Sequence, residues 1–418
     1  MMALGVRGDR MGKIIMYELT KFFNKRKNKL LILALFLFVL GANIYNYKLY
    51  KHYNDRIVEE YRIISEKAKS KLQGLYNELM VYREWGEGEG PFYKERIKSI
   101  EGEMNFLKIE FSVTGRISND FRNVGDPQWN RIICKYLSQR YANIIESYEK
   151  GYIDDTYLRD RKTNIEEARY NRYKYDYFLE NKIPLQENKY EPNGVNSINL
   201  FFEDSNILIL VIIIALLSMD VFLSPVIEGS YKLECTNHFE RKNIFVGKVI
   251  TIFLIMFSIL AVVLLLGFLI NSFIFGIGDF NYPQVVSGSI NELTLKTYEN
   301  NFTVISMSRK ILLGVLMIVA LIFFTIALIM MLSIFTDSTE KTLGVTMILI
   351  ITAFTFNITA DMESIVNLLH PYMYCFYENV ISGFYRSNYL FGIIINIGLG
   401  MLFILISYFR FTRKDFLG

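Results

Sequence analysis

Apolar and polar positions along this chain are separated into long blocks. Six apolar runs cover about residues 30–45, 207–223, 249–275, 311–335, 343–359 and 390–409. Most approach or exceed the roughly 20 residues that a helix needs to cross a bilayer. Inside hydrocarbon every backbone N–H and C=O must be paired within its own segment, so these runs are predicted to be helices. We therefore predict an all-α polytopic membrane protein with six transmembrane helices.

The segment between the first two runs, residues 48–204, is polar and has helical periodicity. Apolar residues recur there every three or four positions, which places them on one helix face: Ile57, Tyr61, Ile64, Ala68, Leu72, Leu75, Leu79 and Tyr82. The same spacing returns after a glycine-rich break at 86–91, in Ile97, Ile100, Met104 and Leu107. Further helices are predicted at about 128–149 and 154–182. We expect a mainly helical extracytoplasmic domain whose first helix continues from the first span, with long helices at its two ends that pack together.

This domain is also rich in tyrosine, and two interpretations of that feature are open. The tyrosines concerned are Tyr136, Tyr141, Tyr148, Tyr157, Tyr170, Tyr173, Tyr175 and Tyr177. Tyrosines at helical spacing usually pack with their rings inside and their hydroxyls at the rim. The alternative is a ligand-binding surface.

The distribution of basic residues predicts the orientation. Residues 1–29 hold eight Lys or Arg and two acidic residues, so the N-terminus is expected to stay in the cytoplasm. With this segment, the predicted inner loops carry sixteen Lys or Arg, whereas the two short outer loops carry four. Both termini are therefore predicted to be cytoplasmic. Arg309 and Lys310 disagree locally, and we expect them to snorkel to the membrane interface.

These patterns divide the chain into four parts. They are a cytoplasmic basic and interfacial segment (1–29), the first span (30–47), the extracytoplasmic domain (48–204), and spans two to six with a cytoplasmic loop at 225–248 (205–418). Residues 17–23 resemble a short amphipathic helix on the inner membrane surface, with a plain basic anchor as the alternative. Met11 or Met16 is a candidate for the true start.

The sequence has no pattern typical of a catalytic or metal site. Gly12-Lys13 and Gly247-Lys248 are followed by Ile14 and Val249, so neither is a Walker A loop. The three histidines are scattered, and no Cys-x-x-Cys pair or carboxylate cluster is present. We therefore expect no catalytic residue, no bound cofactor or metal, and no ATP hydrolysis by this chain.

The loop between the second and third runs has the most specific pattern. Gly229-Ser230 is followed twelve residues after the glycine by Arg241, and seven residues later by Lys248. These spacings resemble the coupling-helix segment of type-2 ABC exporter permeases, in which a Gly-Thr begins a short helix and an Arg and a Lys follow. The family often has a Glu four residues before the Gly and a Pro shortly before the Arg. Pro225 and His238 stand at those places here.

The resemblance implies a docking and coupling role for one set of residues. They are Glu228, Gly229, Ser230, Tyr231, Lys232, Leu233, Glu234, Arg241 and Lys248. Gly229 would permit a sharp exit from the second span, and Arg241 and Lys248 are expected at the inner interface. An ordinary re-entry loop with interfacial charges is the alternative.

Other segments resemble the same family in the same order. Residues 18–29 resemble its interface helix, 326–335 resemble the end of its fourth span, and 361–389 resemble the outer helices or re-entrant turn before its last span. The resemblance covers the spans and their loops. It does not cover 48–204, although some bacterial members with a long insert after the first span look similar.

The resemblance implies a permease subunit of an ATP-driven exporter in the bacterial plasma membrane. Its cargo would be an amphipathic peptide, an antibiotic or a lipid-like molecule, with antimicrobial-peptide resistance as one use. The implied partners are an ABC ATPase in two copies, which binds ATP and Mg, a second permease in a homo- or heterodimer, and membrane lipids, but no nucleic acid. A membrane sensor or assembly protein that recognises a ligand through its ectodomain is the alternative function. An integral membrane enzyme is a third, without catalytic residues to support it.

Overall fold

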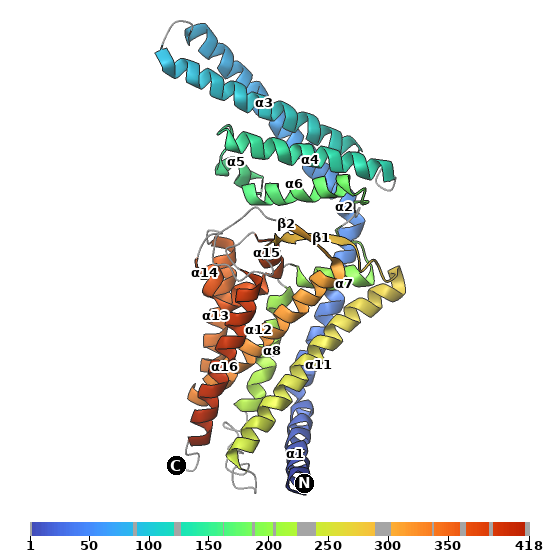
Figure 1. The fold of residues 1–418 in the computed structure, drawn as a ribbon, viewed down its shortest axis with the longest axis vertical. Helices are drawn as coiled ribbons and strands as arrows, with labels where there is room; N and C mark the ends of the chain where they lie inside the picture. The colour runs from blue at the N-terminus through green and yellow to red at the C-terminus, as the bar shows by residue number, and fades with distance from the viewer. Residues whose placement is uncertain are drawn as a thin grey trace. The chain divides into compact units, whose positions relative to one another are not determined.

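The computed structural model describes most of the chain in two compact units. The described residues are 2–86, 90–120, 127–161, 163–185, 189–203, 206–223, 240–288, 302–336, 338–359, 365–383 and 388–413. The first unit comprises residues 1–44, 192–299 and 303–418, and the second comprises 45–191 and 300–302. Both are built mainly of helices (Figure 1).

The first unit contains the apolar helices that the sequence predicts. They are the first part of α2 (Arg26–Gly86), α8 (Asn206–Phe222), α11 (Arg241–Phe275), α12 (Met307–Thr336), α13 (Thr339–Thr359) and α16 (Tyr389–Arg413), and they follow α1 (Met2–Asn24). Within the described residues, five helices are long and apolar enough to cross a membrane, or six if α7 (Gly194–Phe202) and α8 together form one span. A mainly helical protein with several candidate membrane spans is thus supported, as predicted, although the chain is not purely α-helical.

The entry into α8 differs from the expectation. We expected a long helix of the ectodomain to lead into the second span, but α6 ends at Glu180 and α7 is a separate helix of nine residues, inclined to α8 by 74°. Asn193 begins α7, because its Oδ1 accepts a hydrogen bond from the Asn196 backbone N–H at 2.8 Å. Such a side-chain cap satisfies a backbone donor that a helix start leaves free.

Short elements connect the helices of the first unit at the end opposite α1. Strands β1 (Pro283–Ser287) and β2 (Phe302–Ser306) pair in a small sheet that the sequence analysis did not predict. The expected outer helices before the last span are present as α14 (Ile365–Leu369), a 3₁₀ turn at Pro371–Cys375, and α15 (Tyr377–Ser382).

The expectation that Lys310 snorkels to the interface was wrong. This side chain is buried, and its Nζ lies 2.9 Å from Glu378 Oε2 on α15. The Tyr377 hydroxyl also donates to the Lys310 backbone carbonyl at 2.7 Å. The Glu378 carboxylate and the Tyr377 hydroxyl thus hold the start of α12 inside the protein. Neither partner can be inferred from the sequence around Lys310.

The second unit is helical, as predicted. It contains the remainder of α2, then α3 (Gly90–Asp120), α4 (Pro127–Glu149), α5 (Asp155–Asp160) and α6 (Ile165–Glu180). α2 is continuous through the unit boundary at 44–45, which confirms the prediction that the first helix extends beyond the first span. The predicted apolar faces are also confirmed, since Ala68, Leu75 and Leu79 pack with Ile100 and Leu107 in one core.

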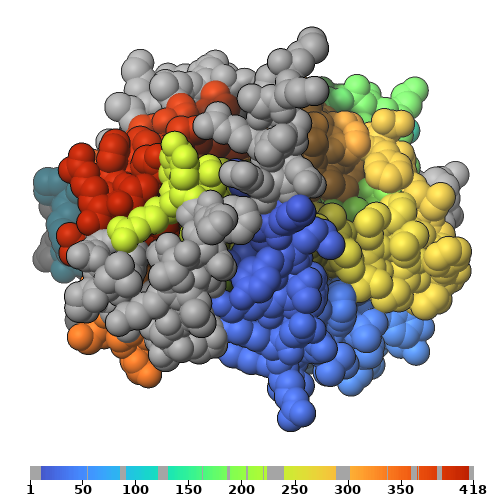
Figure 2. Space-filling view, turned by 90° about the horizontal axis from the view of Figure 1, so that it is seen from below, coloured from blue at the N-terminus to red at the C-terminus, as the bar shows by residue number. Residues whose placement is uncertain are grey.

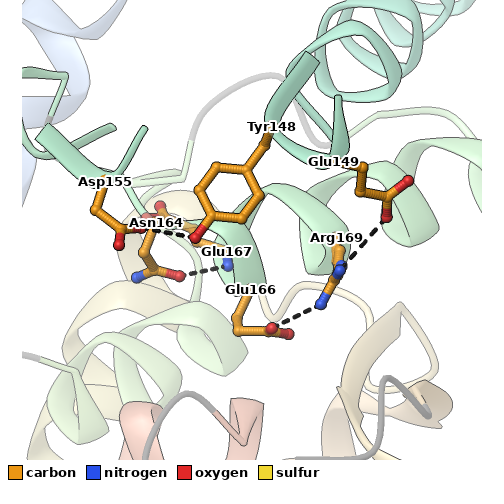
Figure 3. Close-up of polar contacts among 7 residues, drawn as sticks. All are labelled: Tyr148, Glu149, Asp155, Asn164, Glu166, Glu167 and Arg169. Atoms are coloured by element: carbon orange, nitrogen blue, oxygen red, sulfur yellow. Dashed lines mark hydrogen bonds and ion pairs between the residues drawn. The ribbon is translucent and has the colours of Figure 1, made fainter. Parts of the chain in front are cut away.

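The predicted helix at 154–182 is divided in two. Asp154 and Asn164 each accept a hydrogen bond from a backbone N–H three residues later, at 2.9 and 2.7 Å, and so begin α5 and α6. Figure 3 shows the polar contacts around the starts of α5 and α6. The Tyr148 hydroxyl donates to Asp155 at 2.9 Å. Arg169 forms ion pairs with Glu166 on its own helix and with Glu149 on α4. Local capping by Asp154 and Asn164 therefore outweighs the helical periodicity of the predicted single helix.

A buried ion pair lies inside the second unit. Nε and Nη2 of Arg140 on α4 donate to Glu110 Oε1 on α3 at 3.1 and 3.0 Å. Burial opposes the charge on Arg140, but the attraction of Glu110 outweighs it and raises the pKa of the guanidinium. The guanidinium also lies over the rings of Tyr61 and Tyr141.

Several tyrosines of this unit act in packing. Tyr157 is buried in the core, and the Tyr141 ring stacks on Tyr175 at 5.9 Å between centroids. Burial raises the pKa of Tyr61, Tyr141 and Tyr175. These contacts favour the packing interpretation for these residues over a ligand-binding surface. Cys134 in this unit and Cys375 in the first unit are both buried and free.

Candidate functional site

The candidate site is built where α1 meets the first two turns of α11. Residues Ile14, Glu18 and Phe22 of α1 are spaced by four, so they share one helix face, and all three are buried. This amphipathic pattern agrees with the helix predicted at 17–23. Neighbouring residues on the other face, among them Met16 and Tyr17, are more than half exposed.

An ion pair connects the two helices at this contact. Glu18 Oε1 lies 2.5 Å from Lys248 Nζ, and the two side chains are only 4% and 0% exposed. Lys248 is thus buried against α1 within the protein, and its expected position at the inner interface stays a prediction. A charge in this position is stable only when an opposite charge compensates for its lost hydration, which Glu18 does here. Removing either partner would leave the other charged and buried.

Close backbone approach brings the ion pair together. A Cβ atom added to Gly247 would lie 2.5 Å from Ile14 Cγ2, well inside the contact distance of two carbon atoms. The glycine therefore lets α1 approach the helix one residue before Lys248. The Thr251 hydroxyl donates to the Gly247 carbonyl at 2.8 Å, so the polar group next to this contact is satisfied within α11.

The same part of α11 contacts α16. The ring centroid of Phe245 lies 5.6 Å from that of Tyr408 and 5.3 Å from that of Phe411, and Phe411 is fully buried. Figure 2 views this end of the molecule, where the first residues of α11 (yellow-green) lie against the end of α16 (red) and α1 (blue) is on the same face. The first two turns of α11 thus join the N-terminal helix to the last helix.

The start of α11 carries exposed charge. Glu240 occupies the cap position without a side-chain hydrogen bond to the helix, and its Oε2 lies 2.7 Å from Lys242 Nζ. Arg241 is the first residue of the helix and is partly exposed. Basic residues are unfavourable at the positive end of a helix dipole, so the dipole of α11 does not favour Arg241 at this position.

The structure locates two of the nine residues predicted for the site. Glu228, Gly229, Ser230, Tyr231, Lys232, Leu233 and Glu234 lie outside the described residues. Arg241 and Lys248 are on α11, seven residues apart, one partly exposed and the other in the core. Among the described residues no group of three His, Cys, Asp or Glu side chains is placed to hold a metal ion.

The sequence analysis did not select Glu18, Gly247 or Ile14 as site residues. A usable signal was present for Glu18, which is one of two acidic residues in 1–29 and shares a four-residue spacing with Ile14 and Phe22. A lone carboxylate on the apolar face of a basic helix indicates a buried cationic partner. Which of the many lysines would serve as that partner was not evident from the sequence.

Comparison with known families identifies the chain. The model of the ABC-2 family transporter proteins matches residues 18–416, which include the spans, the predicted coupling loop and both sides of the Glu18–Lys248 contact. Searches of curated proteins and of solved structures found no match. Permeases of this family are membrane components that usually work with an ATPase partner and are not themselves catalytic. The apolar helices and the family match together show that this chain is a multi-pass membrane protein of the ABC-2 transporter family, with a permease role.

Proposed function

We propose that this chain is the membrane-spanning subunit of an ATP-driven exporter in a bacterial plasma membrane. It moves an amphipathic peptide, an antibiotic or a lipid-like molecule outward. A separate ATPase, present in two copies, binds ATP and Mg and hydrolyses the nucleotide. A second permease, identical or related, completes the transport unit.

The proposed topology has six spans with both termini in the cytoplasm. α1 and the end of α16 lie at the same end of the first unit, which agrees with an even number of crossings (Figure 1). Basic residues gather in the same loops and termini, as expected for the inner side. In this orientation the α2–α6 unit is extracytoplasmic, and residues 225–240 face the ATPase.

The observation that carries the proposal is the buried contact of α1, α11 and α16 directly after the predicted coupling loop. In this proposal, a movement of residues 225–240 is transmitted to α11 at Arg241, the first residue of that helix. Within two turns, Phe245 contacts α16 and Lys248 is paired with Glu18 of α1. Because these contacts are buried and close, the three helix ends move as one body. ATP binding then shifts the permease between two states through its different affinity for each.

Charge reversal at Arg241 tests this role. The Arg241→Glu variant, reconstituted with its ATPase in liposomes, is expected to lose substrate stimulation of ATP hydrolysis while it still inserts and assembles. Lys242→Glu is the matched control, because Lys242 is adjacent and basic but about half exposed, with its Nζ 2.7 Å from Glu240. Substrate stimulation that is unchanged in the Arg241 variant, or failure of any ATPase to copurify with the wild type, would refute the proposal.

The packing of several tyrosines in the α2–α6 unit weighs against the alternative of a membrane sensor. A sensor that used its tyrosines would present them at the surface. Tyr141, Tyr157 and Tyr175 instead belong to the packed interior or its edge, although Tyr173 is exposed. The exporter proposal uses the contacts of α11, which a sensor would not require.

A further inference from the structure

The short helix α7 is attached by its first turn to the C-terminal end of α11. The backbone N–H groups of Gly194 and Val195 donate to the carbonyls of Gly276 and Ile277, at 3.0 and 2.8 Å. The first N–H groups of a helix have no partner within the helix, and here the residues directly after α11 supply the acceptors. Figure 1 shows α7 beside this end of α11. The two helices are therefore joined through main-chain atoms.

Two glycines allow this attachment to be close. A Cβ atom added to Gly194 would overlap Ser272 Oγ on α11, and one added to Gly278 would overlap Asn193 Oδ1 at the start of α7. Gly278 also has a φ of +88°, which residues with a side chain rarely adopt. We call the contacts of residues 193–195 with 272–278 the α7 clamp. Hydrogen bonds with fixed direction and close packing together make the clamp rigid.

The contact between α7 and α12 has a different character. The Phe202 ring of α7 lies over Gly314 of α12, where an added Cβ atom would be 3.0 Å from the ring. Its centroid is also 5.7 Å from that of Tyr377. Among the described residues no main-chain hydrogen bond joins α7 to α12. Apolar contacts have no fixed direction, so α7 can slide along α12 more easily than it can separate from α11.

A row of polar side chains on α7 is buried in the first unit. Asn196, Asn199 and Glu203 are spaced by three and four residues, so they share one side of the helix, and they are only 2%, 5% and 6% exposed. Asn199 Nδ2 donates to Glu203 Oε1 at 3.2 Å. Polar and charged residues among membrane helices face the interior of the protein and mark transport pathways. We call these three residues the polar row.

We propose that α7 is the outer gate of the transport path and that α11 moves it. A movement that α11 receives at Arg241 reaches its other end, where the clamp passes it to α7. The gate then slides along α12 and presents the polar row to the polar groups of the amphipathic substrate. The structure shows the closed gate, with the row buried. This inference rests on the proposed export function, since that function supplies the movement of α11.

Hydrogen exchange of the full-length protein in nanodiscs tests the clamp without an ATPase. Gly278→Ala forces Asn193 away and strains the backbone, so the amides of α7 should exchange about tenfold faster. Gly267→Ala is the matched control, because its Cβ atom would lie 3.9 Å from Ser197 Oγ, an ordinary contact between α11 and α7. Unchanged exchange of α7 in the Gly278 variant, or equal acceleration in the control, would overturn the clamp.

Two disulfide bonds test which neighbour α7 moves against. In a background with the three native cysteines replaced by alanine, Ser197→Cys with Gly267→Cys joins α7 to α11. Phe202→Cys with Gly314→Cys joins α7 to α12. Both positions lie close enough for a disulfide, which needs Cβ atoms about 3.5–4.5 Å apart. The reduced form of each variant is its own control, since it carries the same substitutions.

Substrate-stimulated ATP hydrolysis with the ATPase partner is the readout. The bond to α11 should leave the stimulation within about twofold of the reduced form, because these helices move together. The bond to α12 should lower it about tenfold, with recovery on reduction. Loss of stimulation with the α11 bond, or none with the α12 bond, would overturn the gate alone. Absence of stimulation in the unmodified protein would overturn the exporter proposal and the gate, while hydrogen exchange still decides whether the clamp is rigid.

Discussion

The two units of this protein use the same two ways of satisfying polar side chains. In the first unit, the hydroxyls of Ser218, Thr325 and Ser333 donate to the carbonyl four residues earlier in the same helix, at 2.6–2.8 Å, and Asn271 on α11 donates to Asn43 on α2. In the second unit, the Thr114 hydroxyl donates to the Glu110 carbonyl of its own helix, and Asn143 on α4 donates to the Phe106 carbonyl on α3. Bonds within a helix satisfy a buried hydroxyl without water, and bonds between helices fix their neighbours.

The units differ in the geometry of their buried ion pairs, as Glu18–Lys248 of the first unit and Glu110–Arg140 of the second show. Lys248 meets Glu18 through a single nitrogen across 230 residues of sequence. Arg140 presents two nitrogens to Glu110 across 30 residues, with aromatic rings beside it. Arg161 lies near enough to interact electrostatically with Glu110 as well. Glu110 thus has a second guanidinium nearby, besides the aromatic rings around Arg140, and this neighbour remains when Arg140 is replaced.

Breaking the Glu18–Lys248 pair should have the largest effect. Glu18→Leu leaves a charged Lys248 buried without its carboxylate, and we expect a loss of about 3–5 kcal/mol in stability. The Tm of the purified protein in detergent measures the loss. The double variant Glu18→Leu with Lys248→Met removes both charges and should recover most of it. If the double variant is as unstable as the single one, the ion pair is not the cause.

Breaking the Arg140–Glu110 pair in the second unit should reduce stability by less than breaking the Glu18–Lys248 pair does. Arg140→Met removes the guanidinium from Glu110, but Arg161 remains nearby, so we expect a loss of about 2–3 kcal/mol. Hydrogen exchange of α3 and α4 in the full-length protein reports it. Glu110→Leu combined with Arg140→Met should restore protection. A loss larger than that of Glu18→Leu would contradict the comparison between the units.

Removal of a helix cap in the second unit should have a smaller effect. Asn164→Ala leaves the Glu167 backbone N–H without its partner and should cost about 1 kcal/mol. We expect faster hydrogen exchange in the first turn of α6 and no change in the membrane helices. Asn164→Asp keeps an acceptor at the same place and is the matched control. Similar exchange in the Ala and Asp variants would show that the cap does not matter.

The smallest expected effect is a pH dependence of stability that arises from the carboxyl group of Glu167. Burial raises the pKa of this carboxyl, against weaker opposing effects of the Thr163 hydroxyl and Arg140. The folded state therefore binds the Glu167 proton more strongly than the unfolded state does. The contribution of this proton to the free energy of unfolding is fully present below about pH 4.5, and it is lost as pH rises through the pKa of the folded state. The Tm difference between wild type and Glu167→Gln should decrease over that rise. An increasing difference would give the opposite sign and contradict the assignment.

Sequence patterns predicted the elements whose stabilisation is local. The apolar face from Ile57 to Tyr82 predicted the long α2, and the repeat from Ile97 to Leu107 predicted its partner α3. The break between α5 and α6 was missed, although Asn164 followed three residues later by Glu167 is a recognisable helix start. The capping residues at the start of α6 were therefore visible in the sequence, but the prediction of one helix over 154–182 followed the longer helical periodicity instead.

The sequence by itself determined the class of this protein: apolar runs long enough for a bilayer can only be helices, and a stripe repeated every three or four residues can only bury one face. Only the tertiary structure decided where Lys248 and Lys310 lie. Both directly precede an apolar run, and that position by itself does not show whether a side chain is buried in the protein. Each is buried, because a carboxylate far away in the chain, Glu18 or Glu378, is brought within 3 Å by packing. Charge pairing depends on distance in space, which the order of residues does not specify.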